Sequence, residues 1–335
     1  MKVFKKIIRG VLIAACAVLL FAVALVFVFP YIEAPADICP MEFTKTLMAA
    51  VPDDTPISEL TVVGTHDSGA NFVQLPYFAK CQSETVAEQL EDGFRYLDIR
   101  LGESGGKLVF YHGFCKCQEG FWPWSSALEL GSVLKDCYSF LAANPSETII
   151  FSVKMEQGDD VEAFQQLLDK YISEAEDNWL LTGEIPKLGD CRGKLVLFRR
   201  YEDAAGLGER AGIPMLWADQ GANDDISLNA SETRENGYIL LVQDRYKYDS
   251  PDKWNAFTAT LEASESIPAD SICLNFLSSN GFPAYGHPYT YANTLNAQLL
   301  ELDQDEIPGS AWIIVDFGNG RIADHILARH FVTGG

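Results

Sequence analysis

The sequence predicts a β/α barrel of the TIM type, either closed or with a distortion that leaves it incompletely closed, preceded by an apolar transmembrane or signal helix. From residue 57 onward, short apolar runs rich in β-branched residues alternate with stretches of helical periodicity. Strands that alternate with helices form parallel sheets, and the number of runs suits a barrel. The sequence contains no internal repeat or low-complexity tract.

The N-terminal helix is predicted from an uncharged apolar run, Val11 to Phe29, that follows a basic start. A run of this length can cross a bilayer as a helix, and its basic flank is expected to stay inside. Three alternatives are open. The length of the apolar run favours an uncleaved signal anchor. Cleavage at residues 34–36 would make the segment a signal peptide. A lipoprotein signal at Cys16 is disfavoured, because the apolar run continues past this cysteine.

Three segments are therefore expected along the chain. Residues 1–31 are the signal anchor or signal peptide, residues 32–56 are a stalk or lead-in interrupted by prolines, and residues 57–335 are the barrel. This organisation predicts a single-pass cell-membrane protein with its barrel outside the cell, or a secreted protein if the signal is cleaved.

The strands are predicted from short apolar or β-branched runs. Residues 60–63 end at Gly64, and residues 94–100 and 108–112 flank a turn at Gly105-Gly106. Residues 148–153 are apolar enough to be buried on both faces. The remaining strands are expected at 194–198, 238–242, 272–276 and 312–315.

The helices are predicted from periodicity and from stop signals. The first ends at Asp92-Gly93, and the second is closed by Asn144-Pro145. The expected helices are 83–91, 125–143, 159–175, 251–263 and 291–302.

Charge and cysteine content limit the class of partner. The net charge of −22 argues against nucleic acid, and any lipid contact should rest on apolar side chains and a local basic pocket. The cysteines after the apolar run are odd in number, so they cannot all pair internally. They are Cys39, Cys81, Cys115, Cys117, Cys137, Cys191 and Cys273. Cys115 and Cys117 have no matching second pair, which argues against zinc.

Polar residues follow the ends of the first three predicted barrel strands. His66 and Asp67 follow the first, Asp98 and Arg100 close the second, and His112 ends the third. The ends of parallel strands meet at one rim, so these side chains are expected to converge. Two histidines with a fixed cation suit phosphoryl transfer. The alternatives are structural histidines and a buried ion pair between Asp98 and Arg100.

These segments resemble the catalytic X domain of the bacterial phosphatidylinositol-specific phospholipases C, in family order from about residue 57 to 317. The matching segments are 63–69 (VGTHDSG), 93–100 (GFRYLDIR), 112–113 (HG), 144–150 (NPSETII), 193–201 (GKLVLFRRY), 242–246 (VQDRY) and 274–279 (LNFLSS).

The resemblance implies a role for each catalytic candidate. His66 would be the general base for the inositol 2-hydroxyl, and His112 the general acid for the diacylglycerol oxygen. Asp67 would assist His112 and contact Arg100, which stabilises charge on the phosphate. Asp98 would hold this group in place.

The resemblance also implies which residue orients the base and which residues bind the substrate. Asp316 would orient His66. An inositol pocket would be formed by Lys154, Arg200, Asp244 and Tyr246, since charged groups suit a ring of hydroxyls and an aromatic face can stack on the ring.

The activity so implied is cleavage of phosphatidylinositol, and in addition glycosylphosphatidylinositol, to diacylglycerol and inositol 1,2-cyclic phosphate by a monomeric enzyme at a membrane surface. Arg100 matches the branch that carries an arginine in place of calcium, so no metal or other cofactor is expected. The alternatives are another barrel phosphodiesterase, for glycerophosphodiesters or sphingolipids, and a catalytically silent barrel that binds lipid or glycan.

The segment 114–124 departs from the family pattern, because it is longer and more aromatic than the resemblance leads one to expect. One hypothesis is that Phe121, Trp122 and Trp124 dip into the bilayer beside the site, since indole favours the interface. The other is that they pack on neighbouring helices.

Overall fold

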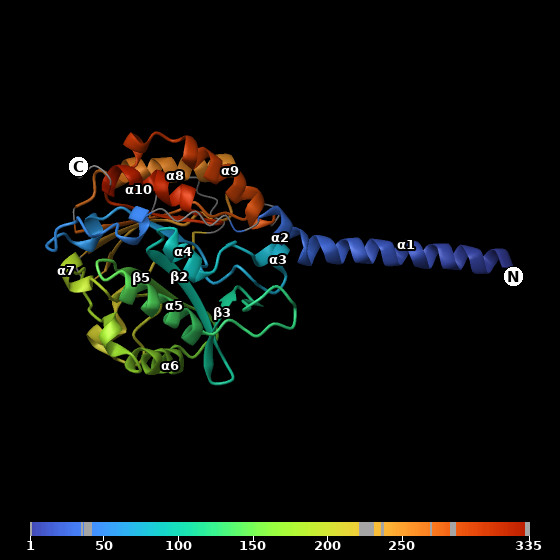
Figure 1. Ribbon diagram of the computed structural model, residues 1–335, viewed down its shortest axis with the longest axis horizontal. Coiled ribbons are helices and arrows are strands. Elements are labelled where there is room, and N and C mark those ends of the chain that lie inside the picture. The colour runs from blue at the N-terminus through green and yellow to red at the C-terminus, as the bar shows by residue number, and fades with distance from the viewer. Residues whose placement is uncertain are drawn as a thin grey trace.

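The fold is an open β/α barrel of the TIM type, from which a long N-terminal helix projects (Figure 1). This computed structural model describes residues 2–34, 36, 42–220, 231–235, 238–268, 270–281 and 286–331. Cys39 and part of the 34–36 segment lie outside the described residues.

One sheet contains nearly all of the strands, in the order β6-β7-β5-β2-β1-β12-β11-β10-β9. Its neighbours pair in parallel except at β9, and β3 and β4 extend it as a hairpin from β2. The strands are β1 Val62–Thr65, β2 Tyr96–Ser104, β3 Lys107–His112, β4 Cys115–Lys116, β5 Ile149–Gln157, β6 Trp179–Leu180, β7 Leu195–Arg199, β8 Ile213–Pro214, β9 Ser231–Glu235, β10 Tyr238–Gln243, β11 Ile272–Phe276 and β12 Ala311–Val315.

The barrel is not closed by backbone pairing within the described ranges. β8 pairs with β7 only, and no ladder joins it to β9 or β10. A side chain bridges the interval instead, because the Tyr238 hydroxyl donates a hydrogen bond to the carbonyl of Pro214. The incompletely closed form of the predicted barrel is therefore the correct one.

The helices cover the outside of the sheet (Figure 1). Several begin at a side-chain cap, which satisfies free N–H groups of the first turn. Thr85 and Glu88 form a capping box at α4, and Asp160 and Asp249 cap α6 and α8. The helices are α1 Lys2–Phe27, α2 Phe29–Glu33, α3 Pro76–Ala79, α4 Val86–Glu91, α5 Leu130–Ala143, α6 Val161–Ser173, α7 Leu188–Cys191, α8 Ser250–Ser264, α9 Pro288–Glu301 and α10 Gly320–Phe331.

The first two helices predicted in the barrel begin later than their periodicity indicated. The cap at Thr85 starts α4 after the predicted residue 83. The stretch before α5 is held by strand bridges, Gln118 to Ala127 and Val109 to Glu129, so its backbone is extended. The longest helix that was not predicted from the sequence is α10, and the short helices α2, α3 and α7 were not predicted either.

Side chains at alternate strand positions fill the barrel interior. Trp312 lies between Tyr96 and Phe198, with ring centroids 6.1 and 5.7 Å away. Position 64, next to these rings, has room only for glycine, because a Cβ there would lie 2.6 Å from atoms of Tyr96 and Ile314. The lower barrel is thus a packed apolar core.

The prediction that residues 108–112 form a parallel barrel strand is wrong. β3 runs antiparallel to β2, with Leu101 opposite Phe110. Gly105 and Gly106 both have positive φ, 66° and 79°, which is the geometry of a two-residue hairpin turn. The strand therefore returns along β2 and brings His112 back level with the end of the barrel, so that convergence at the rim does not need a parallel strand.

The segment expected to be a stalk is attached to the barrel at both of its described ends. Ala34 accepts hydrogen bonds from Lys80 and Ser83. Leu47 and Met48 are buried in the main core.

A buried ion pair joins the second attachment to the base of the sheet. Arg95 Nε lies 3.0 Å from Glu147 Oε2, and the other Glu147 oxygen accepts from the backbone N–H of Met48 at 3.0 Å. Arg95 also donates to the carbonyl of Thr44. Both charged side chains are almost fully buried, so each depends on the other for compensation.

We expect Glu147→Gln to lower the free energy of unfolding by about 3 kcal/mol, because it leaves a buried guanidinium without its counter-charge. Denaturant unfolding of the full chain measures the change. The matched control is Glu91→Gln, which removes a half-exposed partner of Lys45 and should cost less than about 1 kcal/mol. Equal effects for the two variants would contradict this account.

Candidate active site

The interior strand positions change from apolar to polar at the carboxyl end of the barrel. Tyr96 is followed on the same face by Asp98 and Arg100, and Trp312 is followed by Asp316. These polar ends surround a pocket of about 410 Å³. The pocket is lined by His66, Cys81, Arg100, His112, Gly113, Lys154, Glu156, Arg200, Trp217, Asp219, Asp244, Tyr246, Ser278, Ser279, Asn280, Pro288 and Asp316.

Asp98 holds the floor of this pocket together. Its Oδ2 accepts from Arg100 Nε at 2.9 Å, and its Oδ1 accepts from Arg200 Nη1 at 2.9 Å. Burial alone would raise the pKa of Asp98, but the two guanidinium groups outweigh it and hold this pKa well below its ordinary value. Asp98 is therefore ionised, and it fixes both arginines beneath the pocket.

Asp98 also fixes the turn that carries the first histidine. Oδ2 accepts from the backbone N–H of Asp67 at 3.2 Å, and the N–H of Asp98 donates to Ser68 Oγ at 2.9 Å. Asp67 has a φ of 47°, a left-handed conformation that aspartate adopts more readily than most residues. The turn after β1 is thereby locked to β2.

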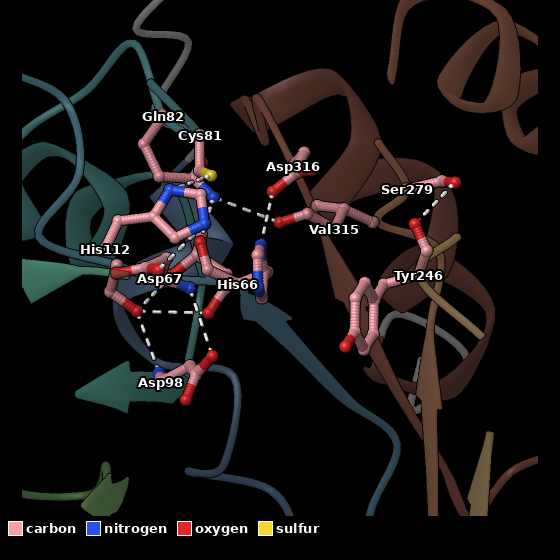
Figure 2. A network of polar contacts seen from close by, with 12 residues as sticks. His66, Asp67, Cys81, Gln82, Asp98, His112, Tyr246, Ser279, Val315 and Asp316 are labelled. Carbon is pink, nitrogen blue, oxygen red and sulfur yellow. Dashed lines mark hydrogen bonds and ion pairs between the residues drawn. The ribbon is translucent and has the colours of Figure 1, made fainter. Parts of the chain in front are cut away.

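His66 lies between Asp316 on one side and the His112 and Asp67 group on the other (Figure 2). His66 Nδ1 is 2.7 Å from Asp316 Oδ1. Burial lowers the pKa of His66 well below its ordinary value, and Arg100 adds to this effect, so the ring is neutral at neutral pH. Burial raises the pKa of Asp316, while Arg100 and Lys253 oppose the shift. The raised pKa favours the protonated carboxyl, and in the state in which Asp316 is ionised Nδ1 carries the hydrogen and Nε2 is the free acceptor.

Asp67 lies below the second histidine. Its Oδ2 is 3.8 Å from His112 Nε2 and 3.7 Å from Arg100 Nε. Burial raises the pKa of Asp67 to about 6 against the opposing effects of His112 and Arg100. Neither carboxylate oxygen has a hydrogen-bond partner in the part of the chain that the structure describes. A buried carboxylate in this state is available to a neighbouring proton donor.

His112 is oriented by the backbone at the end of α3. Its Nδ1 donates to the carbonyl of Ala79 at 2.8 Å, which directs Nε2 toward Asp67. The rings of His112 and His66 meet edge to face with centroids 5.9 Å apart. Two imidazoles, each held by different neighbours, therefore share one pocket. This is the arrangement that catalysis by a general acid and a general base needs.

The four residues expected to bind inositol all line the same pocket. Arg200 stacks on Trp217, with the guanidinium carbon 3.9 Å from the ring centroid. Trp217 Nε1 donates to Asp244 at 3.2 Å, and the Tyr246 hydroxyl donates to Asp219 at 3.0 Å. Lys154 Nζ is 2.6 Å from Glu156.

Several pocket residues were not predicted from the sequence, and among them Glu156 and Cys81 lie beside the predicted ones. Glu156 accepts a hydrogen bond from the N–H of Gly113 at 2.9 Å and lies 3.9 Å from Arg100. Burial would raise the pKa of Glu156, but the charges of Arg100 and Lys154 outweigh burial and lower this pKa. The sequence did contain a signal for Glu156, because polar residues alternate after residue 153, where the strand was predicted to end. β5 in fact continues to Gln157. Cys81 lies 3.4 Å from His112 Nδ1 and carried no sequence signal.

Cys81 is also common to both clusters that could hold a metal ion among the described residues, His66 with Asp316 and Asp67 with His112. Burial raises the pKa of this thiol well above its ordinary value, so it is a neutral and poor ligand. The described cysteines are all free.

The aromatic residues of segment 114–124 do not line this pocket. They lie at the base of α1, where Phe121 packs edge-on against Tyr31 with centroids 5.0 Å apart. Trp122 and Trp124 stack on each other and are largely exposed. Packing on a neighbouring helix is thus observed for Phe121 and not for the two tryptophans.

Comparisons with known proteins agree with this geometry. Residues 54–201 match the sequence model of the family described as phosphatidylinositol-specific phospholipase C, X domain. The chain is 29% identical to a 1-phosphatidylinositol phosphodiesterase of Staphylococcus aureus, covering 81% of this chain and 87% of the relative. It is 26% identical to one of Listeria monocytogenes, covering 86% and 85%.

Solved structures are similar over most of their length. A mutant of the phosphatidylinositol-specific phospholipase C from Staphylococcus aureus matches with a TM-score of 0.69 at 25% identity, covering 84% of this chain and 96% of that chain. The enzyme from Listeria monocytogenes matches with a TM-score of 0.61 at 23% identity, covering 85% and 98%, and that match shows the fold alone.

We expect Asp67→Asn and Asp98→Asn to have opposite effects on stability. The raised pKa of Asp67 means that ionisation costs the folded state, so at pH 7.5 Asp67→Asn should be more stable than wild type by about 2 kcal/mol. That gain should disappear as the pH falls from about 7 to about 4, because the folded wild type then takes up the proton. Thermal unfolding of the full chain at several pH values measures this.

Asp98→Asn is the matched comparison in the same pocket. Its lowered pKa stabilises the folded state at neutral pH, so its loss should cost about 3 kcal/mol, and the difference from wild type should shrink only below about pH 4. A pH-independent loss of stability in Asp67→Asn would show that ionisation of the buried Asp67 carboxyl does not destabilise the folded state.

Proposed function

We propose that this chain, a relative of the bacterial phosphatidylinositol-specific phospholipases C, cleaves phosphatidylinositol to diacylglycerol and inositol 1,2-cyclic phosphate. The observation that carries the proposal is the pair of histidines, 5.9 Å apart between ring centroids, beside a cation fixed by Asp98. This arrangement supplies a base, an acid and a charge for one phosphate.

In the proposed first step, His66 Nε2 removes the proton from the inositol 2-hydroxyl. The 2-oxygen forms a bond to phosphorus, and the bond from phosphorus to the glycerol oxygen breaks. Protonated His112, oriented by Asp67, donates its proton to that leaving oxygen. Because the nucleophile belongs to the substrate, no bimolecular encounter is needed. Slower hydrolysis of the cyclic product would run the proton transfers in reverse and restore both histidines.

Asp316 would position His66 by accepting from Nδ1, which leaves Nε2 free for the 2-hydroxyl. Arg100 would stabilise negative charge on the phosphate oxygens. A guanidinium provides a permanent charge and a fork of donors without any metal ligand, and Asp98 and Asp67 hold it in place. We therefore propose a reaction that needs no metal ion or other cofactor.

The inositol ring would bind among Lys154, Arg200, Asp244 and Tyr246. Ionised and hydrogen-bonding groups there can meet ring hydroxyls, and Tyr246 offers an aromatic face. The same pocket could take the inositol of a glycosylphosphatidylinositol if the glycan leaves through the pocket mouth. The enzyme is proposed to act as a monomer.

We further propose that residues 1–31 anchor the protein and that residues 57–335 form the catalytic barrel outside the cell. Phe4–Phe27 is a helix long and apolar enough to cross a membrane, and it is exposed along its length. It projects away from the body of the molecule (Figure 1). Signal cleavage after this helix would give a secreted form instead.

We expect His66→Ala and His112→Ala each to lower the rate of phosphatidylinositol cleavage by about 10²- to 10⁴-fold, because each removes one proton transfer. Phosphorus NMR of phosphatidylinositol vesicles in excess chelator, with the full chain reconstituted, follows the cyclic product. His325→Ala is the matched control, since His325 bonds the carbonyl of Leu302 far from the pocket, and it should retain wild-type activity.

Two outcomes would count against the proposal. Activity that appears only after calcium is added would place the enzyme in a metal-dependent class. No cyclic product under either condition would favour another barrel phosphodiesterase or a catalytically silent lipid-binding barrel.

A further inference from the structure

An apolar groove lies where the N-terminal helix meets the barrel. It has a volume of about 560 Å³, and none of the residues that line it is charged. Its walls come from the end of α1, from the loop before α3 and from segment 114–124. The lining residues are Val23, Phe27, Val28, Tyr31, Val73, Gln74, Leu75, Pro76, Phe114, Cys115, Gln118, Phe121, Trp122, Pro123 and Trp124.

The groove has a fixed shape because α1 is joined to the barrel through α2 without a spacer. Tyr31 accepts a hydrogen bond from the N–H of Val73 at 3.4 Å and packs on Phe72 and Phe121, with centroids 5.6 and 5.0 Å away. Lys80 lies 5.5 Å from the centre of the Tyr31 ring and donates to the carbonyl of Ala34. The end of α1 therefore has a definite position relative to the rim.

The groove adjoins the polar pocket through two consecutive residues. Gly113 lines the polar pocket and Phe114 lines the groove. Gly113 is held on both sides, by Glu156, which accepts from its N–H at 2.9 Å, and by Gln157, which donates to its carbonyl at 2.8 Å. A molecule with a polar head and an apolar tail can thus occupy both sites at once.

Helix α1, whose end forms one wall of the groove, indicates what surrounds the opening of the groove. From Val11 to Leu25, α1 exposes apolar side chains, and such a surface is stable when lipid tails cover it. Val23, Phe27 and Val28 belong both to this region of the chain and to the groove wall. The groove therefore opens at the level where α1 leaves the bilayer, beside acyl chains.

We infer that this groove binds an acyl chain of the phosphatidylinositol molecule whose headgroup occupies the polar pocket. The lipid comes from the membrane that the protein's own N-terminal helix crosses, from the leaflet that faces the barrel. The identity of the headgroup rests on the proposed function, and the choice of membrane rests on the position of the helix. Segment 114–124 is then the second wall of a lipid-binding site that the N-terminal helix completes. The fixed joint at Tyr31 directs the enzyme to its own membrane.

The first test compares two substrates with one variant of the full chain in vesicles. Phe114→Glu/Trp124→Glu places charge at the groove at two highly exposed positions, so folding should be unaffected. We expect cleavage of phosphatidylinositol in the same vesicles to fall about tenfold or more, since burial of a few methylene groups is lost. Hydrolysis of inositol 1,2-cyclic phosphate, which has no acyl chain, should stay within about twofold of wild type.

The matched control is Leu300→Glu, which adds a charge at an exposed leucine near the far end of α9. α9 starts at the pocket with Pro288, so Leu300 lies about 18 Å along the helix from it. Because α1 keeps every variant in the membrane, a loss of membrane attachment cannot explain a difference. Equal losses on both substrates, or no loss on phosphatidylinositol, would overturn the inference.

The second test detects the acyl chain without catalysis. A tryptophan is placed in the groove floor by Phe121→Trp in a Trp122→Phe/Trp124→Phe background, and the full chain is reconstituted in phosphatidylcholine brominated at mid-chain. We expect the bromines to quench the added fluorescence, whereas the background protein, whose remaining tryptophans lie in the barrel, should show little quenching. An unquenched residue 121 would show that no chain enters.

The two tests separate the failure of this inference from failure of the proposed function. If wild type forms no inositol phosphate but the residue 121 reporter is quenched, the proposed reaction is wrong and the lipid groove stands. If wild type is active and the reporter is not quenched, the reaction stands and the acyl-chain groove is wrong.

Discussion

The ionised carboxylate of Asp98 is the interaction on which the site depends. It is fully buried and neutralised by two guanidinium groups, and it also receives the backbone N–H of Asp67. A buried charge is tolerated only when it is paired and hydrogen-bonded, so this carboxylate determines where both arginines lie. Through the turn at Asp67, it also determines where His66 emerges from β1. One strand position thus connects His66, Arg100 and Arg200.

Around this well-satisfied group lie two others whose charged forms are disfavoured by burial. Asp67 is buried without a hydrogen-bond partner among the described residues, in a left-handed backbone conformation. His66 is kept neutral by burial beside a row of cations. Such arrangements cost folding free energy, and they persist at functional sites because the surrounding structure fixes them. Here the packed core below, with Trp312 between Tyr96 and Phe198, provides that support.

The N-terminal helix and the barrel are joined as one unit. Tyr31 is held against Phe121 and Val73, and the lead-in that follows the helix is fixed through Lys80 and through the buried pair of Arg95 and Glu147. A helix joined in this way has a definite position relative to the barrel, and its end supplies one wall of the apolar groove.

Sequence periodicity was sufficient for most of the fold. Strand and helix patterns are local, so the strands near residues 149, 195, 240, 272 and 312 were found close to their true bounds. The alternation of side chains along a strand is also local, and it was enough to predict that Asp98 and Arg100 share one face. The polar strand ends also indicated His66 and His112, and the family resemblance then supplied their expected roles and the distant partner Asp316.

What local pattern could not supply were the relations between distant segments. Only the tertiary structure shows that β3 returns antiparallel, that no ladder joins β8 to β10 among the described residues, and that Cys81 and Glu156 reach the pocket. The apolar groove is of the same kind, because its walls lie some forty to a hundred positions apart in the chain. The sequence by itself determined which faces are apolar, which strand ends are polar and that an apolar helix comes first. The packing of these faces against one another decided which polar groups meet, since contacts between distant residues follow from shape and burial and leave no period in the sequence.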